Sequence, residues 1–391
     1  MKKKIVLDSL LNIISSIIPI AVLQLFIMPR MASQIDATEY GLVITIISIF
    51  NVVSSTSGNS LNNVRLINND KECEGYGIIL YGMSIFNVIL ISIFSVIYYD
   101  KLLLGQIVLN LIVGTLLYFK DYYVVTFRIY LDYFGVFICN ILISLGYILG
   151  YIIFHFCGVW QFIYICGFLL GIFYIIVTSD IWKDNLKVTN CTGNLAIQTL
   201  TLFVASCLYR IPTYADKMIA FPLIGADNVA VLYTATLIGK IISMAISPIS
   251  AVILSYLSKS KGIDKRIFSK TLYVSVILGT VCYFICLIIS EPILRILYPS
   301  YIIAASSIIP ITTCTVIITS IICIIDPFIM RFYNLRWQIK INTMYVITYL
   351  FLVFICSKEY GIIGFCIGGA ISECMKLLLE IGIIYIAKEN N

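Results

Sequence analysis

Long apolar runs alternate with short polar stretches along almost the whole chain. Most runs are about twenty residues long, the length that an α-helix needs to cross the hydrocarbon core of a membrane. Backbone amides and carbonyls find no partners in lipid, so each run is expected to be a helix. We predict twelve spans, with the approximate bounds 5–28, 41–63, 76–98, 103–125, 133–156, 161–182, 195–220, 229–257, 271–290, 302–325, 340–357 and 361–386.

The composition supports an all-α integral membrane protein. Hydrophobic residues make up 61% of the 391 residues and charged residues only 12%, with a mean hydropathy of +1.02. Soluble domains are about half apolar and a quarter charged. Three lysines, Lys2–Lys4, precede the first run, but that run is too long for a signal peptide and lacks a small-residue cleavage site. It is therefore predicted to be the first span. The connections are short, so we expect no soluble domain.

Lysine and arginine predict the orientation. If the N-terminus is inside, most of them lie in inner loops, and the outer loops hold only Arg30, Lys101, Arg295 and Lys358. Cytoplasmic loops carry such an excess of positive charge, so both termini are predicted to be cytoplasmic. The net charge of +6 favours anionic lipid headgroups, rather than nucleic acid, as the neighbour.

The two halves of the chain show a weak internal repeat. The stretch IPIAVLQLFIMPRMASQIDATEY (18–40) aligns without a gap on IPTYADKMIAFPLIGADNVAVLY (211–233), and two prolines and a final tyrosine coincide. Proline bends a helix, so span 7 is expected to bend where span 1 does. Six spans in each half give a parallel repeat, a pattern found in secondary transporters. We predict six-helix lobes over 1–190 and 191–391; the alternative is a chance similarity between apolar helices.

Span 7 carries charges in the stretch LYRIPTYADKMIAFP (208–222). A charge at the bilayer centre costs about 2.5–3.5 kcal/mol, so such residues face protein or a wet cavity. Helical spacing places Arg210, Tyr214 and Lys217 on one face, with Asp216 on its flank. Span 8 carries a second polar stripe, and span 2 carries a neutral one. These are Tyr233, Thr236, Lys240, Ser243 and Ser247 in span 8, and Thr45, Ser48, Ser55 and Asn59 in span 2.

These stripes predict one aqueous cavity with a positive lining. We expect the substrate-binding residues to be Arg210, Lys217, Lys240, Tyr214 and Tyr233, with Asp216 compensating charge or coupling an ion. Arginine and lysine together suit a phosphate-bearing cargo. A structural network of ion pairs is the alternative.

Other polar residues point away from catalysis. Glu373, Lys376 and Glu380 fall on one face of span 12, where we expect a self-compensating network. His155 is the single histidine, so we expect no metal site. The chain has no phosphate-binding loop, so we expect neither ATP hydrolysis nor an enzymatic cofactor. The thirteen cysteines are scattered through apolar spans and are predicted to be small buried hydrophobes rather than disulfides.

Four segments together resemble the Wzx-type polysaccharide flippases of the multidrug/oligosaccharidyl-lipid/polysaccharide (MOP) exporter superfamily. They are PRMASQIDATEYG (29–41), ADKMIAFPLIGADNVAVLYTAT (215–236), ISEPILRILYPSYIIAASSIIPI (289–311) and YGIIGFCIGGAISE (360–373). In the second segment, Asp216-Lys217 stands where the family usually has Asp-Arg, Gly225 is similar to its turn glycine, and Tyr233 to its tyrosine. In the third, Tyr298-Pro299 replaces the commoner Phe-Gly.

The resemblance implies two six-helix lobes around a central cavity in a bacterial cytoplasmic membrane. It also implies a cargo: an oligosaccharide on undecaprenyl pyrophosphate, such as an O-antigen repeat of lipopolysaccharide, flipped by alternating access. Polymerase and chain-length proteins of the same pathway are expected partners. Two alternatives stay open, a multidrug or cation exporter of the same superfamily and a membrane-embedded glycan polymerase. The polymerase would need a long periplasmic loop, and the predicted connections leave no room for one.

Overall fold

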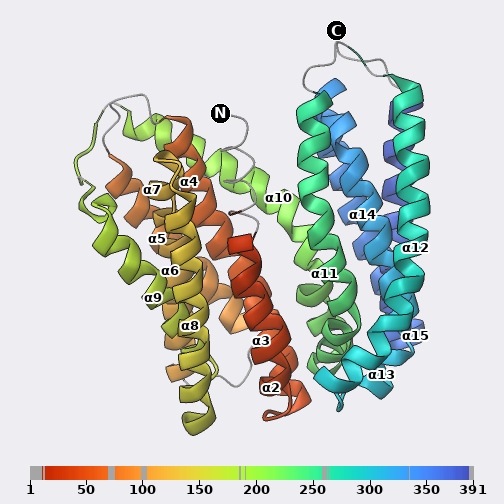
Figure 1. Cartoon of the computed structure of the whole chain (residues 1–391), viewed down its shortest axis with the longest axis horizontal. Helices are drawn as coiled ribbons and strands as arrows, with labels where there is room; N and C mark the ends of the chain where they lie inside the picture. The colour runs from red at the N-terminus through yellow and green to blue at the C-terminus, as the bar shows by residue number, and fades with distance from the viewer. Residues whose placement is uncertain are drawn as a thin grey trace. The chain divides into compact units, whose positions relative to one another are not determined.

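The structure is a computed structural model that describes residues 11, 14–68, 75–97, 104–184, 186–189, 191–257, 262, 264–333 and 335–386 (Figure 1). For some helical residues, among them 208–213 and 244–249, the backbone alone is described. Every regular element in these ranges is a helix. Nine helices in the described ranges are long and apolar enough to cross a membrane. The prediction of an all-α protein with about twelve transmembrane helices is confirmed, and the chain is a multi-pass membrane protein.

The first six spans occupy the part of the chain before residue 184. Span 1 runs over Ile14–Ala32 and contains a π-helical segment, η1 (Val22–Ile27), followed by α2 (Met28–Ala32). Span 2 runs over Ala37–Ile67 and contains a second π-helical segment. Its parts are α3 (Ala37–Phe50), η2 (Asn51–Ser55) and α4 (Thr56–Ile67). The helices that follow are α5 (Tyr76–Ile97), α6 (Leu104–Tyr123), α7 (Val125–Ile129), α8 (Tyr133–Cys157), α9 (Gln161–Thr178) and the 3-10 turn η3 (Ile181–Lys183).

The second half begins with two very long helices. They are α10 (Thr192–Ile224) and α11 (Ala226–Leu257), which are the predicted spans 7 and 8. The bend expected in span 7 from the repeat stays a prediction, because its proline 212 lies among the residues whose side chains are not described. The remaining helices are α12 (Lys265–Leu297), α13 (Ile302–Ser306), α14 (Ile309–Phe332) and α15 (Leu335–Ile386).

The chain divides into two compact units by its internal contacts. The N-terminal unit holds Met1–Gln34 and Thr45–Tyr214, and the C-terminal unit holds Ile35–Ile44 and Ala215–Asn391. The first turns of α3 thus pack inside the C-terminal unit. The six-helix lobes 1–190 and 191–391, which were predicted from the internal repeat, stay a prediction.

Glycine pairs set the closest packing in the N-terminal unit, between α8 and α9. Each helix carries a Gly-x-x-x-Gly motif, Gly146–Gly150 in α8 and Gly167–Gly171 in α9. A Cβ added at Gly146 would lie 2.5 Å from the carbonyl oxygen of Cys166, so no other residue allows this backbone approach. Such motifs drive association of helices in membranes through close van der Waals contact.

The core of the C-terminal unit surrounds α14, which packs against α11, α12 and α15. Phe328 of α14 meets Phe268 of α12 edge to face, with ring centroids 5.3 Å apart. Ile325 and Ile329 lie in the same buried cluster. The last helix breaks at Gly361, whose φ of +56° favours glycine, so α15 provides two arms, the predicted spans 11 and 12.

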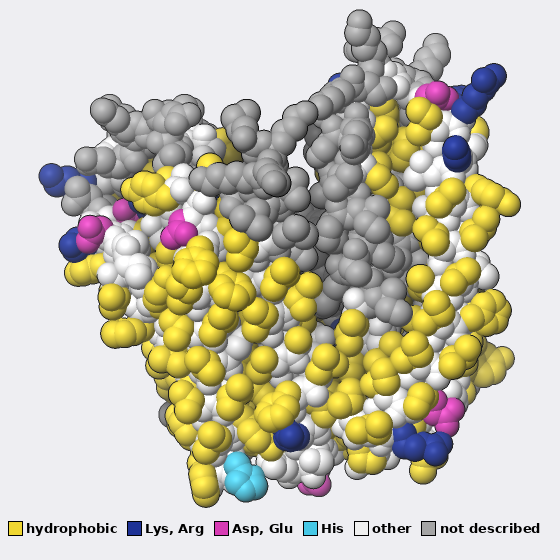
Figure 2. Space-filling model, viewed as in Figure 1, with side chains coloured by type: hydrophobic (Ala, Val, Ile, Leu, Met, Phe, Trp, Pro, Cys, Tyr) yellow, Lys and Arg dark blue, Asp and Glu magenta, His cyan; other side chains and the backbone are white. Residues whose placement is uncertain are grey.

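Apolar side chains also cover the outside of the helices. On the face shown in Figure 2, hydrophobic side chains cover the middle of the helices in each unit, and charged side chains gather near the helix ends. Phe173, Ile288 and Ile347 are examples of large apolar side chains that are well exposed. Exposed apolar patches of this extent mark a surface made for lipid.

Candidate functional site

A tight hairpin between α10 and α11 positions the candidate site. The hairpin turns at Gly225, whose φ of +85° is in the left-handed region, and its N–H donates to the carbonyl of Phe221 at 3.1 Å. A glycine here closes α10 without strain and lets α11 start at the next residue. The C-terminal part of α10 and the N-terminal half of α11 therefore both belong to the C-terminal unit.

Asp216 of α10 and Lys240 of α11 form an ion pair across this hairpin. The Lys240 Nζ lies 3.1 Å from Asp216 Oδ2. The same carboxylate also binds the neighbouring Lys217, whose Nζ lies 3.2 Å from both oxygens. One carboxylate thus serves two ammonium groups, and the three residues, which we call the α10–α11 ion cluster, carry a net charge of +1.

The three members of the ion cluster differ in exposure. The Lys217 side chain is 6% exposed, whereas Lys240 and Asp216 are 26% and 23% exposed. Lys240 and Asp216 are therefore the partly exposed members of the cluster, and Lys217 is the buried member that binds the carboxylate. A polar cargo can reach Lys240 in this arrangement, whereas Lys217 acts through Asp216.

Lys240 lies near the middle of α11, the predicted span 8. It follows the start of α11 by fourteen residues, which is about 21 Å along the helix. The whole helix of 32 residues is about 48 Å long, so this residue lies near its middle. Charged residues at this depth are expensive and usually mark a substrate or ion pathway.

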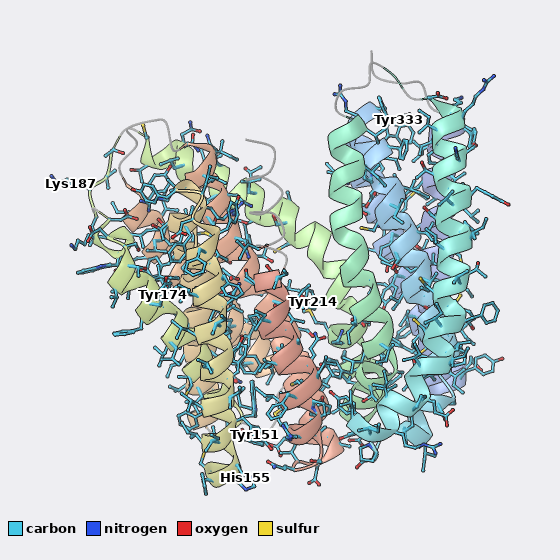
Figure 3. The ribbon with its side chains drawn as sticks, in the orientation of Figure 1. Tyr151, His155, Tyr174, Lys187, Tyr214 and Tyr333 are labelled. Atoms are coloured by element: carbon cyan, nitrogen blue, oxygen red, sulfur yellow. The ribbon has the colours of Figure 1, made fainter. Side chains whose placement is uncertain are left out.

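The other predicted site residues are either outside the ion cluster or outside the described side chains. Tyr214 is half-buried on α10 and belongs to the N-terminal unit (Figure 3). The side chains of Arg210 and Ser247 are outside the described part of the structure. Thr236 is buried and donates to the carbonyl of Tyr233, while Ser243 donates to the carbonyl of Lys240 at 3.0 Å.

Tyr233 belongs to a buried cluster of tyrosines rather than to the ion cluster. Its ring centroid lies 6.1 Å from that of Tyr40, its counterpart in the sequence repeat, and 6.4 Å from that of Tyr298. Tyr40 also donates its hydroxyl to Tyr298 at 3.3 Å. Both packing and hydroxyl pairing hold these rings inside the C-terminal unit.

A second polar cluster, with Asp326, Glu373, Lys376 and Glu380, lies between α14 and α15. Tyr345 donates its hydroxyl to Glu373 Oε1 at 2.8 Å, and the Lys376 Nζ lies 4.0 Å from Glu380. Asp326 lies close enough to interact with Lys376 and Glu380. The helical spacing in span 12 predicts a cluster of the last three residues. Asp326 is a lone acid in an apolar run, and no spacing pattern connects it to them.

The side chains of the polar stripe of span 2 lie inside the N-terminal unit, where several form hydrogen bonds. Thr45 and Ser48 are buried. Asn59 donates to the carbonyl of Ser55 at 2.7 Å and to Asp121 Oδ2 at 3.3 Å. Asp121 is also paired with its neighbour Lys120. These bonds join α4 to α6, so the stripe contributes to the packing of two spans.

No protein-family model and no curated protein matches the chain. Solved structures do match it. The lipid II flippase MurJ in an inward closed conformation superimposes with a TM-score of 0.72 at 15% identity, covering 97% of this chain and 87% of that one. A multidrug resistance MATE family transporter of the MOP superfamily, in its inward-facing conformation, gives 0.64 at 13% identity over 97% and 94%. A eukaryotic MATE transporter gives 0.61 at 12% identity over 97% and 95%.

These comparisons define the fold. The chain has the fold that the lipid II flippase MurJ and the MATE transporters share. The similar proteins are transporters and flippases rather than enzymes. The match extends over almost the entire chain, so the whole chain corresponds to one transporter fold.

Proposed function

We propose that the chain is a Wzx-type flippase that moves an oligosaccharide carried on undecaprenyl pyrophosphate across the bacterial cytoplasmic membrane. The observation that carries this proposal is the α10–α11 ion cluster, in which one carboxylate pairs with two ammonium groups on the predicted spans 7 and 8. Its net positive charge lacks the stabilisation that water would give, so it attracts an anion. A pyrophosphate on a lipid carrier is an anion that reaches this depth.

In this proposal the residues of the ion cluster have different roles in binding. Lys240 is the partly exposed cation that meets the phosphate, and Asp216 holds it in position. Arg210, Tyr214 and Tyr233 remain proposed substrate-binding residues on the same two helices. The two lobes, proposed as 1–190 and 191–391, would rock around the site to give alternating access. The lipid tail stays in the bilayer, where the apolar outer surface of the helices accommodates it.

Similarity to the lipid II flippase supports a lipid-linked cargo, because that protein is named for moving a lipid-linked precursor. Similarity to MATE transporters supports the second candidate, a multidrug or cation exporter. The observation that favours this candidate is the second polar cluster, where Asp326, Glu373 and Glu380 outnumber Lys376. Buried carboxylates would suit a cationic cargo, whereas the ion cluster suits an anionic one.

Complementation of a strain that lacks this gene distinguishes the two candidate functions. Variants Lys240→Ala and Arg210→Ala, supplied back at normal protein levels, should fail to restore the surface glycan and should let the lipid-linked oligosaccharide accumulate. Lys270→Ala, which removes an exposed cation at the end of α12, should restore both. Full surface glycan with both Lys240→Ala and Arg210→Ala would exclude the proposal. Loss of drug resistance without a change in glycan would favour the exporter.

A further inference from the structure

The α6–α8 connection of the N-terminal unit holds an arginine with an uncommon set of partners. Arg128 lies on the short helix α7, and its Nη1 donates to Asn62 Oδ1 at 2.6 Å and to Asn63 Oδ1 at 3.1 Å. Both partners are neutral amides. No carboxylate among the described residues lies within ion-pair distance of the guanidinium, although other cations of this unit have one.

The neighbouring acids are all engaged elsewhere. Asp184 pairs with Arg65, whose Nη2 lies 3.0 Å from its Oδ1. Asp121 pairs with Lys120. Asp132, four residues after Arg128, caps α8 by accepting the N–H of Gly135 at 2.9 Å. Arg128 therefore has no ion-pair partner among the described residues of this unit.

The amide partners fix the direction of the guanidinium. Asn62 is buried and donates its own amide to the backbone carbonyl of Asp121 at 2.9 Å, so its oxygen cannot turn away. Phe127, the neighbour of Arg128 in the sequence, stacks on Tyr174 of α9 with ring centroids 5.9 Å apart. Helix α7 is thus held on both sides. Among the described residues only Nη1 of Arg128 has hydrogen-bond partners, so Nε and Nη2 are a fork of donors that matches a phosphate.

Exposed apolar side chains follow Arg128 closely in the sequence, in the turn and in the first residues of α8. Tyr130, Leu131 and Phe134 are 80%, 64% and 61% exposed. Leu131 has a φ of +53°, a conformation that is costly for leucine, and the turn keeps it there while it connects α7 to α8. A cation next to exposed tyrosine and aliphatic side chains is the pattern of a membrane interface, where a lipid presents its phosphate above its chains.

We propose that Arg128, held by Asn62 and Asn63, binds the phosphate of a lipid whose apolar chain lies along Leu131 and Phe134. The ligand class is a lipid with a phosphate monoester, diester or pyrophosphate, from either the membrane or the transported cargo. The site lies at the end of the unit that carries Lys187 (Figure 3). Helix α4 connects the two: it carries Asn62 and Asn63, and its Arg65 binds Asp184, three residues before Lys187. The proposal does not depend on the cargo proposed above.

The test measures binding to the purified full chain in detergent by native mass spectrometry. The four probes are undecaprenyl pyrophosphate, undecaprenol, phosphatidylglycerol and phosphatidylcholine. Arg128→Gln should weaken binding of at least one anionic lipid tenfold or more, and Arg128→Lys should give an intermediate loss because it keeps the charge without the fork. The matched control is Lys187→Gln, which removes an exposed cation at the same end and should change each affinity less than twofold.

The probe that loses affinity identifies the source of the phosphate. A loss for undecaprenyl pyrophosphate alone assigns the site to the cargo, and a loss for phosphatidylglycerol alone assigns it to a membrane lipid. An Asn63→Ala variant, which removes one of the two amides, should lower the same lipid affinity. Its thermal stability should stay close to that of the wild type. The proposal is overturned if Arg128→Gln and Lys187→Gln bind all four probes equally. That result would leave the proposed transport through Lys240 unaffected.

Discussion

Replacing Asp216 by asparagine should destabilise the protein by leaving two ammonium groups without their shared anion. The carboxylate lies 3.1 Å from Lys240 and 3.2 Å from Lys217. Two unit charges about 4 Å apart at an effective dielectric constant of about 20 interact by about 4 kcal/mol. Removing one partner of a buried pair costs about 3–5 kcal/mol, and the partial exposure of Asp216 favours the lower end, about 3 kcal/mol.

The assay is equilibrium unfolding in mixed detergent micelles, with a double-mutant cycle. Asp216→Asn should lower the free energy of unfolding by about 3 kcal/mol, whereas Lys217→Met should cost less because one acid and one base remain. The double variant should recover at least half of the loss caused by Asp216→Asn. As a control, Asp180→Asn removes an exposed pair with Lys183 and should change stability by less than about 1 kcal/mol.

Two results would refute this reasoning. The first is an Asp216→Asn protein as stable as the Asp180→Asn control. The second is a double variant that is no more stable than Asp216→Asn alone, because the buried Lys217 would then not depend on its carboxylate.

Three further changes test other parts of the structure. Gly146→Ala should lower the free energy of unfolding by about 1–3 kcal/mol, because the added Cβ meets the backbone of α9, whereas Gly82→Ala, with open space around it, should have little effect. Tyr345→Phe leaves a buried oxygen of Glu373 without its donor and should cost about 1–3 kcal/mol in the same unfolding assay. Gly225→Ala puts a side chain at a φ of +85° and should lower the melting temperature by an amount that corresponds to about 1 kcal/mol.

The hydrophobic pattern predicts the helices well and their ends less well. The predicted span 271–290 corresponds to α12, which extends over Lys265–Leu297. The helix continues beyond the apolar run at both ends, and Lys270 and Arg295 lie in these extensions. The Gly-x-x-x-Gly motifs of α8 and α9 are not among the features that the sequence analysis used, and only the packing shows that they join these two helices.

The candidate site shows what helical spacing can and cannot predict. Helical spacing places Lys217 and Asp216 on adjacent faces of one span. It does not predict that the Asp216 carboxylate is shared with Lys240 of the next helix, because that contact depends on the hairpin at Gly225. Tyr233 was expected beside Lys240, but it packs with other tyrosines because the rings of α3 and of the α12–α13 turn surround it. The predicted span bounds place Arg128 in the inner loop between spans 4 and 5, whereas the structure places it on the short helix α7, a break that hydropathy does not indicate.

Transport by the purified protein tests the central proposal most directly. The full chain is reconstituted in proteoliposomes, and the rate at which a fluorescent oligosaccharide on undecaprenyl pyrophosphate changes leaflets is measured. We expect the wild type and the Lys270→Met control to move this lipid, and Lys240→Met to slow it at least tenfold while its unfolding stays close to that of the wild type. A Lys240→Met protein that moves the lipid as fast as the wild type would contradict the account.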